Sequence, residues 1–208
     1  MGENVFLYIF YLIDFDESKM ASFLTNDDFL KCKRYKTEQG YKEHVSSLYL
    51  KKRFIGEFEI SKTGKPISNN AYFNISHSGE YVVLAISNSD IGVDIEHVKE
   101  TKDDIKKYIS SNEEYEYIKS DLNFFEVWTS KESISKAVGC GITNNVKAIP
   151  ALPLVGVKHY LNKDFYSKMI YKDDYVISIT KETKNEFNID LEMVMLWNII
   201  HYQVLYLI

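Results

Sequence analysis

Three apolar strand patterns follow one another closely in the first half of the chain. Residues 81–87 form a continuous apolar run (YVVLAIS), and short turns separate it from the patterns at 72–76 and 91–96. Apolar runs of this length, bounded by turn residues, indicate β-strands. Residues 123–138 carry the strongest helical pattern, which stops at a Gly-Cys-Gly sequence. Strands and helices in this mixture predict an α+β fold.

The two ends of the chain are apolar. The run 5–13 predicts a buried strand, because it lacks a basic leader and is shorter than the roughly 20 residues that span a bilayer. The tail, residues 190–208, is interrupted by Asn198, His201 and Gln203. A docked amphipathic helix, an added strand and a poorly ordered tail all fit it. The polar interruptions argue against a membrane span.

Composition narrows the class of protein. The 208 residues suit one large domain or two halves of about 100 residues each. A formal net charge of −5 argues against a broad nucleic-acid surface. Cys32 and Cys140 fit neither a disulfide framework nor a zinc pattern, as in a reducing cytoplasm. We therefore expect a cytoplasmic protein with no nucleic-acid partner and no membrane association.

The sequence Gly-Val-Asp-Ile-Glu at 92–96 pairs two carboxylates. Residues two apart in a strand project from the same face, so Asp94 and Glu96 point together. Two adjacent carboxylates repel each other, and a hard divalent cation bound through oxygen would neutralise them. Taken alone, such a pair is more often a solvated strand face.

A second motif lies on the long helix, where Trp128 is followed by Lys131, Glu132 and Lys136. Glu132 and Lys136 are four residues apart and share a helix face. Taken alone, they would form an ordinary surface pair that stabilises the helix by a few tenths of a kcal/mol.

A third motif, Ser-His-Ser-Gly, lies between two strand patterns, and its first two residues are Ser76 and His77. Its hydroxyls, imidazole and flexible backbone suit the oxygens of a phosphate group. A turn with ordinary side-chain capping is the simpler interpretation.

The three motifs in this order resemble the 4′-phosphopantetheinyl transferases, specifically the two-lobed, surfactin-synthetase-activating (Sfp) type. The resemblance is concentrated in residues 73–96 and 128–141. It implies two similar α+β lobes in a pseudo-twofold arrangement, residues 1–97 and 98–208, with the active site in the cleft between them. Because one chain would complete its own site, it also implies a monomer.

The resemblance further implies the chemistry. Such an enzyme transfers the 4′-phosphopantetheine group of coenzyme A to a serine of an acyl or peptidyl carrier protein and releases 3′,5′-ADP. Asp94, Glu96 and Glu132 correspond to the ligands of Mg²⁺, which Mn²⁺ could replace. Glu132 is the candidate base. Lys136 would stabilise phosphate charge or assist the leaving group.

The resemblance also suggests how coenzyme A is bound. Ser76 and His77 correspond to a pair that contacts its nucleotide end, Lys65 to an adenine-side lysine, and Lys31 to a phosphate-binding residue. A helix hydroxyl between residues 44 and 47 would contribute another contact. The chain departs from the family at Asp28, where a second basic residue is frequent, so one phosphate contact is in doubt.

Two other functions remain open from the sequence. A non-catalytic module that holds coenzyme A or a carrier protein would keep the Ser-His turn without needing three carboxylates and a lysine. A magnesium-dependent pyrophosphate hydrolase would use the same acidic residues but would have to admit water freely.

Overall fold

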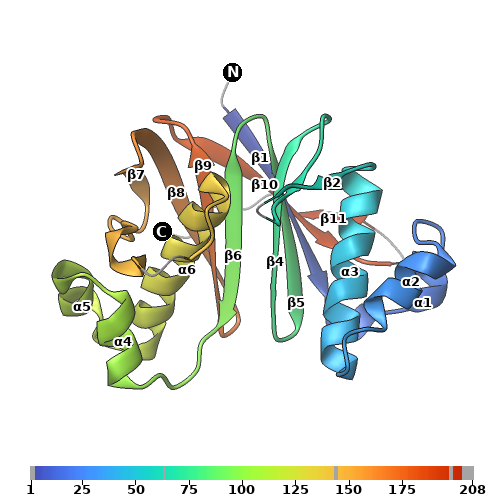
Figure 1. Ribbon diagram of the computed structural model, residues 1–208, viewed down its shortest axis with the longest axis horizontal. Coiled ribbons are helices and arrows are strands. Elements are labelled where there is room, and N and C mark those ends of the chain that lie inside the picture. The colour runs from blue at the N-terminus through green and yellow to red at the C-terminus, as the bar shows by residue number, and fades with distance from the viewer. Residues whose placement is uncertain (1–2, 63, 143–144, 197–198, 203–208) are drawn as a thin grey trace.

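The computed structural model describes residues 3–62, 64–142, 145–196 and 199–202. They form a five-stranded sheet, a four-stranded sheet and a small two-stranded ribbon, together with α-helices, so the predicted α+β class is confirmed. In Figure 1, α3 covers the five-stranded sheet on one side of the molecule and α6 covers the four-stranded sheet on the other.

The elements follow the sequence patterns closely. The strands are β1 (Glu3–Tyr11), β2 (Glu59–Ile60), β3 (Pro66–Ile67), β4 (Tyr72–Ser78), β5 (Tyr81–Ser87), β6 (Ile91–His97), β7 (Gly156–Tyr160), β8 (Lys163–Lys172), β9 (Tyr175–Glu182), β10 (Phe187–Val194) and β11 (Ile199–Tyr202). The α-helices are α1 (Glu17–Met20), α2 (Asn26–Cys32), α3 (Glu38–Phe54), α4 (Asp103–Ile109), α5 (Asn112–Tyr117) and α6 (Asp121–Val138). Short 3₁₀ turns occupy Leu12–Asp14 and Val146–Ala148.

The five-stranded sheet has the order β11-β10-β1-β5-β4. β1 pairs with β5 in antiparallel and with β10 in parallel fashion. α3 begins at Thr37, whose side chain accepts a hydrogen bond from the amide of Gly40. Val45 and Leu50 of α3 are fully buried and pack with Leu84 of β5. α3 therefore packs against β5 and also contacts the outer strand β4.

The four-stranded sheet has the order β6-β9-β8-β7, and α6 packs on β6 and β9. α6 begins at the N-cap Ser120 and ends at Gly139, whose positive φ of 79° suits glycine. β6 comes so close to the helix that a Cβ atom at Gly92 would overlap the carbonyl oxygen of Ser133. The same atom would lie 2.5 Å from the amide nitrogen of Ala137. Gly92 therefore sets the distance between β6 and α6.

Replacing Gly92 by alanine is expected to lower the free energy of unfolding by about 1–3 kcal/mol, the range for an overpacked core. The upper end is expected because backbone atoms of α6 cannot rotate away from the added methyl group. Urea denaturation followed by circular dichroism measures the change. An unaltered midpoint would show that β6 and α6 can separate at no cost.

β6 and β4 connect the two sheets. In Figure 1 they lie side by side in the centre of the molecule. The amide of Val93 donates to Oδ1 of Asn74 at 3.0 Å, and the amide of His97 donates to Oγ of Ser78 at 3.2 Å. Side chains of β4 thus replace the backbone ladder along this edge of β6. The two motif-bearing strands are held next to each other.

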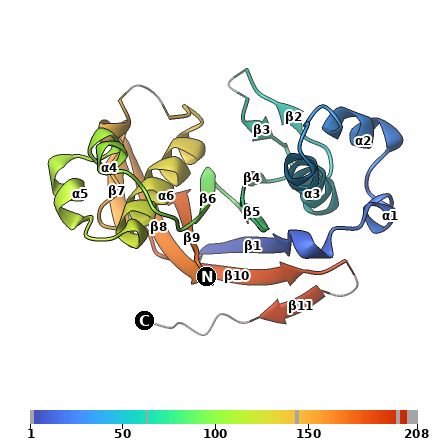
Figure 2. The ribbon, with the colours of Figure 1, turned by 90° about the horizontal axis from the view of Figure 1, so that it is seen from below.

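The sheets exchange strands across the expected lobe boundary at residues 97 and 98. β6 lies before this boundary but pairs with β9, and β10 lies after it but pairs with β1. Figure 2 shows β10 running beside β1, with β11 at the outer edge. The two-lobed division and its pseudo-twofold symmetry stay predictions.

The apolar tail, residues 190–208, contains strand structure where it is described. β10 continues to Val194, and Leu191 to Val194 pair with β11 in antiparallel register. Of the possibilities for the tail, the added strand applies to these segments, and residues 197–198 and 203–208 lie outside the described residues. No helix in the described part of the chain has the length and apolar character needed to cross a membrane.

A buried charged cluster fixes the loop after α6. Lys131 is fully buried, lies 2.8 Å from a carboxylate oxygen of Glu114, and donates to the carbonyl oxygens of Val146 and Ile149. Nearby, the ammonium group of Lys158 donates to Oγ of Ser130 at 2.8 Å. Burial lowers the pKa of Lys158 to about 7, although Glu114 opposes this shift.

The free energy of unfolding is expected to rise by about 1–2 kcal/mol between pH 7 and pH 9 because of Lys158. In this window the unfolded chain keeps the proton, whose pKa there is about 10.4, while the folded chain has lost it. Unfolding therefore takes up a proton, and higher pH favours the folded state. Urea denaturation of the wild type and of Lys158→Met across this range measures the effect. Parallel curves for the two proteins would show that Lys158 does not titrate in the core.

Candidate active site

Six of the eight predicted site residues meet in one cavity of about 420 Å³. The cavity is lined from α3, β4, β6 and α6, so both sheets contribute to it. The lining residues are His44, Ser47, Lys51, Ile75, Ser76, His77, Asp94, Glu96, Glu132 and Lys136. The motifs that are separated in the sequence therefore share one site.

Asp94 lines the cavity from β6 and is only 4% exposed. Its Oδ1 atom accepts hydrogen bonds from Oγ of Ser76 at 2.8 Å and from Nζ of Lys136 at 2.6 Å. Lys136 also donates to Oγ of Ser76 at 2.9 Å. Lys136 thus pairs with Asp94, and the interpretation as a simple helix surface pair with Glu132 does not describe it.

The second oxygen of Asp94 is an exception to the usual pairing of buried polar atoms. Oδ2 is buried and has no hydrogen-bond partner within the described residues. Leaving a buried acceptor unpaired costs about 1–3 kcal/mol, and more for a charged group. The atom is thus available to a ligand.

Glu96 is held in place by two donors from different elements. Oγ of Ser78 donates to Oε2 at 3.0 Å, and Nε1 of Trp128 donates to Oε1 at 3.3 Å. Burial, and then the charge of Asp94, raise the pKa of Glu96 above its usual value. The alternation in β6 is as expected, because Val93 and Ile95 point into the core on the opposite face.

Glu132 is half-buried on α6 and has the most strongly shifted carboxyl group of the site. Burial, followed by the charge of Asp94, raises its pKa to about 7. The positive charge of Lys136 acts in the opposite direction, and Glu96 adds to the increase. The charge of Lys136 alone therefore does not hold the pKa of Glu132 at its usual value.

This donor set fits a hard divalent cation. Carboxylate oxygens are the protein ligands that magnesium prefers, and it commonly keeps positions for substrate phosphates. Among the described residues, Oδ2 of Asp94 has no hydrogen-bond partner, and Glu96 and Glu132 have raised pKa values through burial and neighbouring negative charge. A bound cation would give Oδ2 of Asp94 a partner and would neutralise the negative charges of Glu96 and Glu132.

His77 lies at the α3 side of the cavity. Its Nδ1 atom is 3.3 Å from Oε2 of Glu43, and its ring contacts the ring of His44 edge-on. Burial lowers the pKa of His77, and the charge of Glu43 opposes this shift. Ser47, within the range 44–47, lines the same cavity, and the expected contact of a hydroxyl group from this range with coenzyme A stays a prediction.

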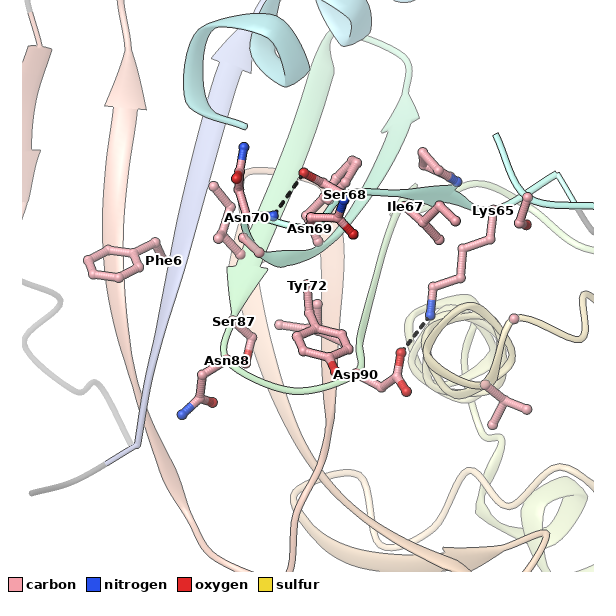
Figure 3. A pocket seen from close by; sticks show the side chains of 18 of the residues that line it. Phe6, Lys65, Ile67, Ser68, Asn69, Asn70, Tyr72, Ser87, Asn88 and Asp90 are labelled. Carbon is pink, nitrogen blue, oxygen red and sulfur yellow. Dashed lines mark hydrogen bonds and ion pairs between the residues drawn. The ribbon is translucent and has the colours of Figure 1, made fainter. Parts of the chain in front are cut away.

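Lys31 and Lys65 lie elsewhere, and their proposed roles stay predictions. Lys31 is exposed on α2, where it pairs with Asp27 at 2.6 Å. Lys65 lines a second, larger cavity of about 1,000 Å³, where it lies 3.0 Å from Oδ1 of Asp90 (Figure 3). It also donates to the carbonyl oxygen of Ala137 at 2.8 Å.

Asp28, which departs from the family pattern, has a structural position. It forms a capping box with Thr25 at the start of α2, and its carboxylate pairs with Lys52 at 2.6 Å. The side chain thus fixes α2 against α3.

Three residues of the site were not identified from the sequence. Ser78 and Trp128 orient Glu96, and Lys51 lines the cavity from α3. Ser78 and Trp128 belong to the motifs named above. Each can donate a hydrogen bond to Glu96 only because β4 and α6 lie next to β6 in the fold, which the sequence does not show. Lys51 stands in the last turn of α3, where its charge complements the helix dipole. Burial lowers the pKa of Lys51.

Comparison with known proteins agrees with the motifs. Residues 90–180 match the family model of the 4′-phosphopantetheinyl transferase superfamily. This segment contains Asp94, Glu96, Glu132 and Lys136. The 4′-phosphopantetheinyl transferase gsp of Aneurinibacillus migulanus is 41% identical over 92 residues, which are 41% of this chain and 39% of that protein.

Two proteins of Bacillus subtilis match longer segments. The 4′-phosphopantetheinyl transferases ffp and Sfp are 29% and 28% identical over 147 residues, which cover 62% of this chain and 66% of each relative. The matches thus span between 39% and 66% of the length of these curated relatives.

The acidic cavity and these matches make residues 90–180 similar to the 4′-phosphopantetheinyl transferase superfamily, and longer segments similar to individual transferases of this kind. Sfp of Bacillus subtilis is among these similar proteins, which agrees with the resemblance noted from the three motifs.

Proposed function

We propose that this protein transfers the 4′-phosphopantetheine group from coenzyme A to a serine of a carrier protein and depends on Mg²⁺. The observation that carries the proposal is the gathering of Asp94, Glu96, Glu132 and Lys136 in one cavity with Ser76 and His77. A binding module would need neither the three carboxylates nor the lysine.

In the proposed reaction, the oxygen of the carrier serine attacks the β-phosphorus of coenzyme A. A phosphorus–oxygen bond forms to the serine, the bond to the bridging oxygen breaks, and 3′,5′-ADP leaves. Asp94, Glu96 and Glu132 would hold Mg²⁺, which when bound supplies a Lewis acid that neutralises pyrophosphate charge. A serine hydroxyl is a weak nucleophile and needs a base within hydrogen-bond reach.

Glu132 is the proposed base, because it is a half-buried carboxylate that lines this cavity. Its pKa of about 7 belongs to the metal-free site, and a bound cation would lower this pKa and keep the carboxylate ionised at neutral pH. It would accept the proton of the serine hydroxyl. Lys136 is held by Asp94 and Ser76 in the metal-free site. Its ammonium group would stabilise the charge that develops on the phosphoryl oxygens.

The nucleotide end of coenzyme A would extend towards α3. Ser76 and His77 line that part of the cavity, and Lys51 adds a cation there. Lys31 and Lys65 are candidate contacts of the phosphates and of the adenine, because each has an ammonium group at the end of a long side chain. The physiological carrier could belong to fatty-acid, polyketide or nonribosomal-peptide synthesis.

Mass spectrometry of an unmodified carrier protein, incubated with this protein, coenzyme A and Mg²⁺, tests the function. Transfer adds the phosphopantetheine mass to the carrier and produces 3′,5′-ADP. Release of 3′,5′-ADP without a modified carrier would indicate a pyrophosphate hydrolase. Binding of coenzyme A with no product of either kind would indicate a binding module.

His77→Ala is expected to raise the KM for coenzyme A by about 10–100-fold with little change in kcat, since hydrogen bonds to charged groups contribute about 1.5–3 kcal/mol. A contact with the 3′-phosphate is equally strong in ground and transition states, so it affects binding alone. Steady-state kinetics with coenzyme A and with dephospho-coenzyme A measure this. The second donor lacks the 3′-phosphate and should be nearly insensitive. An equal penalty on both donors would contradict this role.

A further inference from the structure

A second group of metal-ligating side chains borders the cavity on the α3 side. Glu43 and His44 on α3 and His77 on β4 each offer one ligand atom, and these atoms all lie within 4.8 Å of one another. All three side chains are half-buried. Within residues 3–62, 64–142, 145–196 and 199–202, no other set of three His, Cys, Asp or Glu side chains meets this limit.

The side chains of this cluster are oriented by their neighbours. Nδ1 of His44 lies 2.8 Å from the carbonyl oxygen of Gly40, which can only accept a hydrogen bond, so Nδ1 carries the proton. The lone pair of His44 is then on Nε2. Oε1 of Glu43 accepts a hydrogen bond from Gln39 at 2.9 Å, while Oε2 faces Nδ1 of His77 at 3.3 Å.

Such outer contacts are typical of built metal sites. Metal-binding histidines usually donate their other ring N–H to a carbonyl or carboxylate oxygen, and metal-binding carboxylates are in turn hydrogen-bonded. Here the carbonyl oxygen of Gly40 accepts a hydrogen bond from His44, and the side-chain amide of Gln39 donates one to Glu43. The ring of Tyr35 stacks on the ring of His44 and further restricts its rotation. An accidental ion pair between Glu43 and His77 would not require these supports.

We propose that Glu43, His44 and His77 form a binding site for a transition-metal dication such as Zn²⁺, distinct from the three carboxylates. Two imidazoles and one carboxylate suit zinc, whereas magnesium prefers oxygen ligands. Three protein ligands leave a fourth position of tetrahedral zinc unfilled. His44 and His77 line the cavity, so a ligand in the cavity can take that position.

Titration calorimetry with ZnCl₂ on the untagged chain, in excess Mg²⁺, tests the site without any substrate. We expect one saturable Zn²⁺ equivalent per chain. Glu43→Leu and His44→Phe should abolish it or weaken it by more than about 100-fold, and Gln39→Leu should weaken it by about 10–100-fold. His44→Phe retains an aromatic ring against Tyr35. His44→Gln serves if that variant does not fold, as judged by circular dichroism.

Matched controls separate this site from other ligands of the chain. Cys140→Ser, His159→Ala and Glu132→Gln should keep the Zn²⁺ affinity of the wild type, because these residues lie outside the cluster. Co²⁺ should give a visible absorption band that His44→Phe removes. Absence of saturable Zn²⁺ binding, or affinity that follows Cys140 or Glu132 in place of Glu43 and His44, would overturn the proposal. Binding that survives both Glu43→Leu and His44→Gln would do so as well.

Discussion

Replacing Asp94 by asparagine is expected to lower the turnover of phosphopantetheine transfer by about 10³-fold or more at saturating Mg²⁺. A bound cation stabilises transition-state charge by several kcal/mol, and each 1.36 kcal/mol corresponds to about a factor of ten in rate. The atom that matters most is Oδ2, which is buried and unpaired within the described residues. In asparagine, neither side-chain atom carries the charge of a carboxylate ligand.

Asparagine is the better replacement because Asp94 is buried. Oδ1 accepts hydrogen bonds from Ser76 and Lys136, and an amide oxygen can still accept both. Alanine would leave Lys136 beside a small cavity, so a loss of activity could then reflect a changed fold. Urea denaturation of the Asp94→Asn protein should therefore give a midpoint near that of the wild type.

The measurement is the initial rate of carrier modification over a range of Mg²⁺ concentrations. Asp164→Asn is a suitable control, since Asp164 on β8 pairs with His159 and Lys184 and does not line the cavity. That variant should match the wild type. Near-wild-type turnover of Asp94→Asn at limiting Mg²⁺ would remove Asp94 from the set of metal ligands.

Local sequence patterns were sufficient for the strands and helices that carry the site. The apolar run 81–87 corresponds to β5, and the helical pattern at 123–138 corresponds to α6 apart from two residues at its start. Period-two alternation correctly separated Asp94 and Glu96 from the core side of β6. These features depend on backbone geometry within a few residues, which a sequence pattern records.

Features that depend on distant parts of the chain could not be predicted in this way. β10 pairs with β1 although about 180 residues separate them, and no local pattern indicates such a partner. Lys51 on α3 lines the cavity, whereas the predicted Lys31 pairs with Asp27 on the surface. Where a lysine side chain ends is decided by its tertiary neighbours. The helix α4 was also missed, since its polar sequence resembles a connection.

Glu132→Gln is expected to lower turnover by about 10²–10⁴-fold, the usual effect of removing a general base. Glutamine keeps the size of the side chain but has neither the negative charge nor the proton affinity. Lys136→Ala should lower kcat more than it raises the KM, because its charge is needed most as the phosphoryl group moves. The double variant should be little slower than Glu132→Gln alone, since both residues act on one step.

The stability of the same variants gives a second readout that does not depend on activity. The pKa of Glu132 in the folded protein is about 7, above its value near 4.3 in an unfolded chain. Between these two pH values the unfolded chain loses the proton first, so the folded state loses stability as the pH rises. Without Mg²⁺ at pH 7, Glu132→Gln should therefore be at least as stable as the wild type. A simple surface pair would instead make both variants slightly less stable, by under about 0.5 kcal/mol.

Added Mg²⁺ reverses this order if Glu132 is a ligand. A cation that binds only the folded state raises the free energy of unfolding by RT ln(1 + [L]/Kd), which depends on its affinity. The wild type binds Mg²⁺ more tightly than Glu132→Gln, so its melting temperature should rise further over the same titration. Thermal denaturation with and without Mg²⁺, combined with carrier-modification rates, therefore separates the ligand from the base. Full activity together with an unchanged magnesium effect in Glu132→Gln would exclude both roles, whereas a lost magnesium effect with retained turnover would exclude the base alone.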